Sequence, residues 1–309
     1  MPIKKWNKKI AMHDSRTHRL WPAVFRRLGV AKWLNYKHPF SISGRVFSIP
    51  IVGGLGENLL KLEPDFKSEV IRLFGDKLPG VFVDIGANLG QTILEAFANR
   101  QWDRYIALEP SPMVCAYLEL LVKANRLPVE ILPWAAGQDA LPHNYCAQGD
   151  ADASATMAPQ GRPGVYSPEM SRWVATYPLD MLQEFSPLPQ GVMIKIDVEG
   201  FEADVLAGAG KILSEVRPII LCEVLRAYQE DQRAFTEERM SRLEAILVRH
   251  KYRIFYIEME NEISGAIQAF KEIPSFPRQL WRENPTGMDY LFAPAETDLP
   301  DAALRPIAK

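Results

Sequence analysis

The chain has 309 residues, of which 47% are hydrophobic and 24% are charged, and its formal net charge is −2, a composition that is ordinary for a soluble globular protein. The cysteines Cys115, Cys146 and Cys222 are odd in number, lie far apart and form no Cys-x-x-Cys spacing, which argues against a disulfide framework and against a zinc site. No apolar run approaches the roughly 20 residues that span a bilayer, and the N-terminus lacks the apolar stretch and cleavage site of a signal peptide, so we expect a cytoplasmic protein.

The chain begins with a strongly basic segment. Residues 1–38 contain ten Lys or Arg residues and a single acid, Asp14, so this segment carries +9 and the remainder carries −11. Aromatic residues such as Trp6, Trp21 and Trp33 are interleaved with the basic ones. This combination is typical of a segment that lies on an anionic surface, whether lipid, phosphorylated glycan or nucleic acid, and also of a solvated extension that covers a partner. We predict a basic and aromatic N-terminal extension over residues 1–42, with contact to an anionic surface such as a membrane periphery as its candidate role.

A short hairpin and a helix are predicted between this extension and the core. Residues 43–50 alternate in polarity, and the glycines of residues 52–56 indicate a turn, which together favour a hairpin. Pro64 then opens a helical pattern that runs to Phe74. Residues 43–80 are therefore predicted to lead into the core.

From residue 81 onward, strand and helix patterns alternate along the chain. Seven strands are predicted, over residues 81–85, 105–108, 129–133, 192–197, 218–224, 252–258 and 289–293. Helical patterns are predicted over residues 91–99, 112–125, 202–216 and about 231–250. This alternation predicts an α/β fold with a Rossmann-like wound sheet over residues 81–295, followed by a C-terminal tail over residues 296–309.

Two long segments interrupt this rhythm. Residues 137–172 are rich in Gly, Pro, Ala and Ser and have little apolar periodicity, and residues 259–287 likewise predict a loop. Long irregular stretches inside a compact domain are usually functional loops or disorder. We predict that the excursion over residues 137–172 crosses the ligand-binding edge of the sheet as a candidate lid.

The first strand of the core ends in a motif that is typical of a ligand cradle. Residues 81–85 form an alternating apolar strand, the loop contains Gly86 and Gly90, and a helical pattern follows over residues 91–99. Glycine lets the backbone approach a bound molecule closely, and the first turn of a helix offers unpaired N–H groups to an anionic group. An ordinary tight turn between a strand and a helix would have the same pattern.

The spacing of this motif narrows the kind of ligand. The dinucleotide fingerprint would place glycines at the positions of Asn88 and Gln91, so binding of a pyrophosphate, and with it a nicotinamide oxidoreductase, is disfavoured. The form Asp84-x-Gly86-x-x-x-Gly90 is instead one that is associated with S-adenosylmethionine. A carboxylate at the end of the strand suits the ammonium group of an amino acid better than it suits a phosphate.

A second motif, over residues 193–200, places charges on a strand of the core. The alternation of a strand puts Lys195, Asp197 and Glu199 on one side, whereas a central parallel strand usually reads as a continuous apolar run. Burial of one unpaired ion costs several kcal/mol. Either Lys195 pairs with a carboxylate as a structural device, or the charged row opens into a polar cleft at the carboxyl end of the sheet.

Two further carboxylates end strands of the same predicted sheet. Glu109 follows the strand after the glycine loop, where an acid can accept hydrogen bonds from two ribose hydroxyls. Glu223 ends a fifth strand, where a salt bridge or a solvated strand end would also explain it. All four motifs fall beyond the carboxyl ends of strands, where wound sheets bind ligands.

Several motifs in order resemble the FkbM family of S-adenosylmethionine-dependent methyltransferases. They are residues 84–90, Glu109-Pro110, Leu179-Asp180, residues 194–202 and residues 205–208. The resemblance covers about residues 45–293. It implies the seven-stranded class I methyltransferase fold with an antiparallel last strand, and commonly O-methylation of hydroxyls on sugars or secondary metabolites. Family members often have a His just beyond the fifth-strand Glu, where this chain has Val224-Leu225.

The resemblance also implies roles for the residues at the site. The residues that would bind the methionine end of the cofactor are Asp84, Gly86, Asn88 and Gly90. Glu109 would bind the ribose, and the adjacent Pro110 would also belong to the cofactor site. An aliphatic hydroxyl needs a positioned base before it becomes a good nucleophile. We predict Asp197 as the base or the residue that orients the acceptor, Glu199 as the next candidate and Lys195 as their charge partner.

Other interpretations of the same residues stay open. In one, Asp197, Glu199 and Glu223 are ligands of Mg²⁺, which would acidify a bound hydroxyl, although carboxylates alone do not establish a metal. A nucleic-acid methyltransferase would use the basic extension, but the chain has no Asn/Asp-Pro-Pro-Tyr-type motif, and Cys222 sits in an apolar strand. A cofactor-binding interaction module without catalysis is a further alternative. The favoured partner is a small-molecule or glycan hydroxyl acceptor, whose identity and class the motifs do not specify further.

Overall fold

The computed structural model describes residues 35–62, 66–75, 78–149, 152, 154–162, 164–259, 267–283 and 287–299. Residues 1–34 of the predicted extension, Pro64 and the tail from residue 300 lie outside this described part. The contact of the basic segment with an anionic surface therefore stays a prediction. Within the described ranges, no helix combines the length and the apolar character that a membrane crossing requires.

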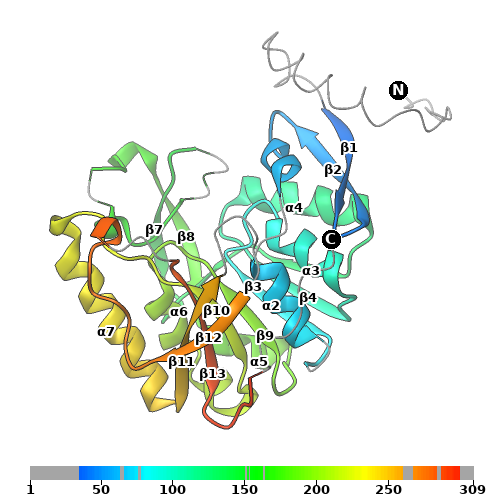
Figure 1. The fold of residues 1–309 in the computed structure, drawn as a ribbon. Helices are drawn as coiled ribbons and strands as arrows, with labels where there is room; N and C mark the ends of the chain where they lie inside the picture. The colour runs from blue at the N-terminus through cyan, green and yellow to red at the C-terminus, as the bar shows by residue number, and fades with distance from the viewer. Residues whose placement is uncertain are drawn as a thin grey trace, which may run out of the picture.

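The centre of the molecule is an eight-stranded sheet (Figure 1). Its strands follow the order β12-β11-β13-β10-β9-β3-β4-β5. Their bounds are β3 (Val81–Ile85), β4 (Arg104–Leu108), β5 (Val129–Leu132), β9 (Met193–Ile196), β10 (Ile219–Glu223), β11 (Tyr252–Met259), β12 (Ile267–Ile273) and β13 (Asp289–Pro294). Strands β3, β4, β5, β9 and β10 pair in parallel, whereas β13 is antiparallel to both of its neighbours. The predicted α/β class and the antiparallel last strand are confirmed.

The eighth strand corrects the prediction of seven. Residues 259–287 were expected to form a loop, but they contain β12, which pairs antiparallel with β11 at the edge of the sheet. Lys271 and Glu272 are exposed on it. An edge strand that is solvated along much of its length has no continuous apolar run, which explains why the sequence pattern did not reveal it.

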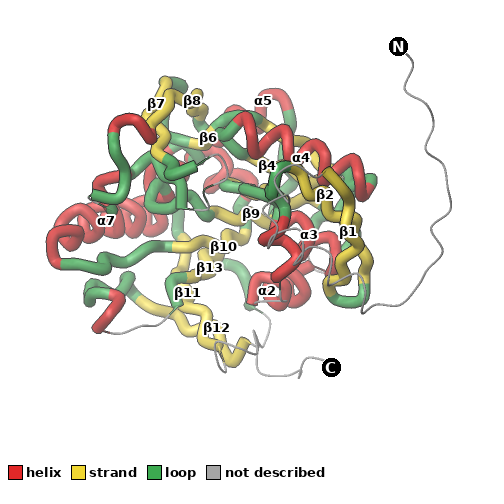
Figure 2. The backbone as a smooth tube through the Cα atoms, turned by 90° about the horizontal axis from the view of Figure 1, so that it is seen from above, coloured by secondary structure: helices red, strands yellow, loops and turns green. Residues whose placement is uncertain are grey.

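Helices cover both faces of the sheet (Figure 2). One face packs against α2 (Phe66–Gly75), α3 (Gln91–Asn99) and α4 (Pro112–Asn125). The other face packs against α5 (Leu182–Phe185), α6 (Glu202–Ala207) and α7 (Arg233–Arg249). The strand order reverses between β3 and β9, and a crevice for ligands is expected at such a switch point, outside the carboxyl ends of the strands.

The helix predicted over residues 202–216 is interrupted. It ends as α6 at Ala207 and resumes as a π-helical turn over Ile212–Val216. The interruption has two tertiary causes. A Cβ atom at Gly208 would lie 2.0 Å from the carbonyl oxygen of Gly137, and the carboxylate of Asp180 accepts hydrogen bonds from the backbone N–H groups of residues 211 and 212, both at 2.9 Å. Asp180 thus caps the resumed segment, which gives the Leu179-Asp180 motif a structural role.

The N-terminal hairpin is longer than predicted and turns elsewhere. Its strands are β1 (Asn35–Ile42) and β2 (Arg45–Val52), so part of the predicted extension belongs to it. The predicted turn at residues 52–56 does form, closed by a bridge between Val52 and Leu55, but it follows β2 and is not the turn of the hairpin. The hairpin turn is Ser43-Gly44, both with positive φ, a conformation that suits the twist of a hairpin. The side chain of Asn125 on α4 bonds both backbone groups of Ser48, at 2.7 and 3.0 Å, and fastens the hairpin to the core.

The excursion over residues 137–172 is partly regular. It contains β7 (Pro142–Cys146) and the start of β8 (Ser171–Tyr177), which pair antiparallel, and β6 (Ala135–Ala136) pairs in parallel with β8. This three-stranded sheet stands beside the central one (Figure 1). The prediction of an irregular excursion is therefore corrected in part.

Candidate functional site

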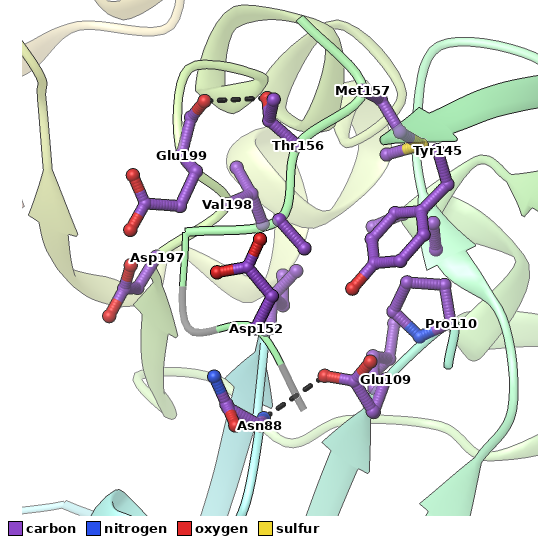
Figure 3. A pocket seen from close by; sticks show the side chains of 16 residues that line it. Asn88, Glu109, Pro110, Tyr145, Asp152, Thr156, Met157, Asp197, Val198 and Glu199 are labelled. Atoms are coloured by element: carbon purple, nitrogen blue, oxygen red, sulfur yellow. Dashed lines mark hydrogen bonds between the residues drawn. The ribbon is translucent and has the colours of Figure 1, made fainter. Parts of the chain in front are cut away.

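A cavity of about 590 Å³ opens at the carboxyl ends of β3, β4 and β9 (Figure 3). Six of the residues predicted for the site line it: Gly86, Asn88, Glu109, Pro110, Asp197 and Glu199. Four others do not line it: Asp84, Gly90, Lys195 and Glu223. The excursion supplies the opposite wall, with residues that the sequence motifs did not single out.

The glycine loop has backbone geometry that only glycine accommodates. Gly86 has φ +81°, and a Cβ atom there would lie 2.0 Å from the carbonyl oxygen of Asp197. Gly90 has φ +92°, and its Cβ would lie 2.7 Å from the side chain of Leu121 on α4. The first glycine therefore lets the two sequence motifs touch, and the second lets α3 begin against α4.

Asp84 and Lys195 form a buried pair behind this loop. Asp84 is fully buried and Lys195 is 3% exposed. Lys195 Nζ lies 3.2 Å from Asp84 Oδ1 and 3.4 Å from Asp197 Oδ2, and it donates a hydrogen bond of 2.8 Å to the Gly86 carbonyl. Tyr105 Oη donates a hydrogen bond of 2.9 Å to the other oxygen of Asp84, Oδ2. Burial by itself would lower the pKa of Lys195, but the two carboxylates outweigh it and hold this pKa above its ordinary value.

This arrangement bears on the role predicted for Asp84. Its carboxylate faces Lys195 and Tyr105 and not the cavity, so it supports the loop from behind. Lys195 likewise acts on the shape of the loop and on the charge of Asp197. The pairing follows from register, because Asp84 and Lys195 are Cα partners across β3 and β9.

Glu109 is held in place at the cavity by backbone hydrogen bonds and can accept further ones. It is 5% exposed, and its two oxygens accept backbone N–H groups from Asn88 at 3.0 Å and Ser111 at 2.8 Å. Burial raises the pKa of Glu109 to about 7, against the opposing effect of these two donors. Each carboxylate oxygen keeps further capacity to accept a hydrogen bond, which suits a pair of neighbouring hydroxyls such as those of a ribose.

Three carboxylates lie close together beside the other end of the cavity, two of them in its lining. Asp197, Glu199 and Glu223 each offer an oxygen, and these oxygens lie within 4.8 Å of one another. Burial raises the pKa of Glu223 to about 9, with the charge of Asp197 adding to the effect. Burial would also raise the pKa of Asp197, but Lys195 and Lys67 outweigh it and leave this pKa below its usual range. These opposite shifts favour the neutral form of Glu223 beside the ionised form of Asp197.

Glu199 is tied to the excursion. Its backbone has φ 53°, its carbonyl oxygen accepts a hydrogen bond of 2.7 Å from Thr156 Oγ1, and its carboxylate pairs with Arg162 Nη2 at 2.5 Å. Burial raises the pKa of Glu199 to about 7 in spite of Arg162. Thr156 and Arg162 were not predicted, because their segment has no periodicity and no motif that could have marked them.

The three carboxylates could also bind a divalent cation, for which oxygen ligands are suitable. Such an ion would have to compete with Lys195 for Asp197 and with Arg162 for Glu199. Two of the three carboxylates therefore already have cationic partners in the protein, which favours handling of a proton over binding of Mg²⁺. Cys222 is fully buried, so it is poorly placed as the nucleophile that cytosine C5 chemistry would need.

Comparisons with known proteins identify one family and several distantly similar solved structures. The Methyltransferase FkbM domain matches residues 84–254. No curated protein matches the chain.

Three of the solved structures to which the chain is distantly similar are methyltransferases by name. A methyltransferase FkbM from Methylobacillus flagellatus is 16% identical with a TM-score of 0.41, and the match covers 75% of this chain and 48% of that one, about half its length. A SAM-dependent methyltransferase from Agrobacterium tumefaciens is 9% identical over 85% of this chain and 71% of that one, with a TM-score of 0.37. A precorrin-6y C5,15-methyltransferase from Geobacter metallireducens is 15% identical over 72% and 84%, with a TM-score of 0.31.

Proposed function

The chain belongs to the FkbM methyltransferase family, and from this premise we propose that it is an O-methyltransferase whose acceptor is a hydroxyl of a sugar, a glycan or a secondary metabolite. Methyl transfer is its reaction and S-adenosylmethionine is its methyl donor. The observation that carries the proposal is the placement of an ionised carboxylate, Asp197, at the end of the cavity opposite Glu109 (Figure 3).

The residues of the cavity fit this donor. When bound, the donor supplies an electrophilic methyl group on a sulfonium. Glu109 would accept hydrogen bonds from the ribose, and the backbone of Gly86 and Asn88 would lie against the rest of the molecule. Pro110 and the apolar side chains of Leu108 and Met157 would cover the base, since they line the same end of the cavity.

Asp197 would act on the acceptor. A hydroxyl that donates its hydrogen bond to Asp197 keeps an oxygen lone pair free to attack the methyl group. As the new bond forms, the proton of this hydroxyl becomes more acidic, and Asp197 can accept it. Lys195 keeps Asp197 ionised, and protonated Glu223 donates to Asp197 and so fixes its position. Glu199 is the second candidate for the same task, because its pKa of about 7 lies close to neutral pH.

The proposed reaction is tested by transfer of a labelled methyl group to panels of glycans, lipids and small metabolites. We expect label in a hydroxyl-bearing acceptor and none in the matched acceptor whose hydroxyl is already O-methylated. We also expect EDTA to leave turnover unchanged, because the carboxylates are neutralised by protein groups. Label found only on nitrogen or carbon would contradict O-methylation, and a loss with EDTA that Mg²⁺ restores would assign the carboxylates to metal binding.

The raised pKa of Glu109 leads to a pH dependence of cofactor binding. The ionised carboxylate accepts hydroxyl donors and the protonated one accepts fewer, so affinity should be highest above the pKa of about 7. We expect the Kd of S-adenosylhomocysteine to rise by up to about ten-fold per unit as pH falls from 7 to 5.5, since one proton is displaced on binding. Calorimetry across this range measures it.

Glu109→Gln provides the control for this dependence. Its side chain does not titrate, so its affinity should be weaker than that of the wild type at pH 8 and should vary little with pH. An equal slope in both proteins would assign the titration to another group, of which Glu199 is the nearest in pKa.

A further inference from the structure

The wall of the cavity that faces Glu109 is built by the excursion, and it contains a buried tyrosine. Tyr145 lies on β7 and is 9% exposed. Its ring packs in a small cluster with Ala135, Ala147 and Val174. The ring lies above Pro110, and the hydroxyl points into the cavity on the side of Asp152 and Glu109 (Figure 3).

The hydroxyl of Tyr145 has no hydrogen bond to any residue of the described part of the chain. The phenol groups of Tyr105 and Tyr117 donate at 2.9 Å to Asp84 and to the Pro50 carbonyl. Those of Tyr252 and Tyr290 also have no described partner, but neither residue lines the cavity. A tyrosine that is buried to this degree usually finds a partner for its hydroxyl. A hydroxyl that is aimed into a ligand cavity without one indicates that the ligand provides the partner.

The surroundings of this hydroxyl identify the part of the ligand. Glu109 and the backbone of Asn88 supply polar groups on one side, and Leu108, Ala136 and Met157 supply an apolar wall. A nucleoside has this combination of a diol and a flat apolar base. The carboxylate cluster at residues 197–199, where the methyl group must be delivered, lies at the other end of the cavity.

We propose that Tyr145 is a cofactor-binding residue whose hydroxyl hydrogen-bonds the nucleoside of S-adenosylmethionine, so that the excursion completes the cofactor half of the site. This inference rests on the proposed function, since it takes the donor from it. The three-stranded sheet would then bind the cofactor as a fixed wall of the cavity, through β7, and would not act as a lid.

Tyr145→Phe tests the proposal by removing only the hydroxyl. We expect the Kd of S-adenosylhomocysteine to rise about ten-fold, the loss of one hydrogen bond. The same rise is expected for 5′-methylthioadenosine, which has the nucleoside but no amino-acid end. The melting temperature of the variant without ligand should equal that of the wild type, because the hydroxyl bonds no described residue, while the increase caused by the ligand should be smaller.

Tyr177→Phe is the matched control, since Tyr177 lies on β8 of the same small sheet and does not line the cavity. Its Kd values should equal those of the wild type. Unchanged binding of both ligands to Tyr145→Phe would overturn the proposal, as would a loss confined to S-adenosylhomocysteine. Wild-type protein that binds neither ligand would instead contradict the cofactor of the proposed function, so the two failures are distinguishable.

Discussion

Replacing Lys195 with methionine is expected to lower the free energy of unfolding by about 3–5 kcal/mol, the usual effect of removing one partner of a buried ion pair. The side chain of Lys195 is buried, and its ammonium lies 3.2 Å from a carboxylate, Asp84, that is fully buried. Without it, the carboxylate of Asp84 keeps, among the described residues, the hydrogen bond from Tyr105 alone, and the Gly86 carbonyl loses the hydrogen bond from Lys195. Urea denaturation followed by circular dichroism measures the loss.

Two further variants test whether the loss of stability comes from leaving the buried carboxylate of Asp84 unpaired or from removing any lysine charge. Lys123→Met, on the exposed face of α4, should change the free energy of unfolding by less than about 0.5 kcal/mol. Combining Lys195→Met with Asp84→Asn should recover much of the stability, because no buried charge then lacks its partner. Losses that simply add in the double variant would mean that the two residues stabilise the fold independently.

The strands of the core could be predicted because each is an apolar run of the expected length. Val81–Ile85 and Ile219–Glu223 are buried almost throughout, and burial on both faces leaves a clear signal. β1 and β12 lack this signal because β1 belongs to a separate hairpin and alternates exposed and half-buried residues, and β12 is an edge strand with exposed and half-buried residues along most of its length. The break after Ala207 could not be predicted, because it depends on Asp180 and Gly137, which are distant in sequence.

The gathering of carboxylates could be anticipated, whereas their directions could not. Glu109, Asp197 and Glu223 follow or end β4, β9 and β10, which are parallel strands of one sheet, so they had to reach the same edge of it. Whether a strand-end acid faces the cavity or the interior depends on register, and the register of β3 against β9 turns Asp84 toward Lys195. Tyr145 and Arg162 could not be identified at all, since they come from an excursion whose path across the site is set by tertiary contacts.

Asp197→Asn is expected to lower kcat about 10²–10⁴-fold, the range that positioned proton acceptors contribute, while the Kd of S-adenosylhomocysteine stays within about two-fold. The amide keeps the size of the side chain, but it cannot take a proton from the acceptor. Lys195 retains Asp84, so the melting temperature should change little. Single-turnover transfer to an identified acceptor, measured beside calorimetry of the cofactor, distinguishes a loss of chemistry from a loss of binding.

Two variants show whether this effect belongs to Asp197 itself. Asp204→Asn makes the same chemical change on α6, where the carboxylate pairs with Arg242 outside the cavity, and it should leave kcat unchanged. Glu223→Gln should cost far less than Asp197→Asn below pH 9, because the amide donates to Asp197 as the protonated carboxyl does at a pKa of about 9. If Glu223→Gln were instead as inactive as Asp197→Asn, ionised Glu223 would be required, and a shared metal ion would explain the three carboxylates better than proton transfer to Asp197.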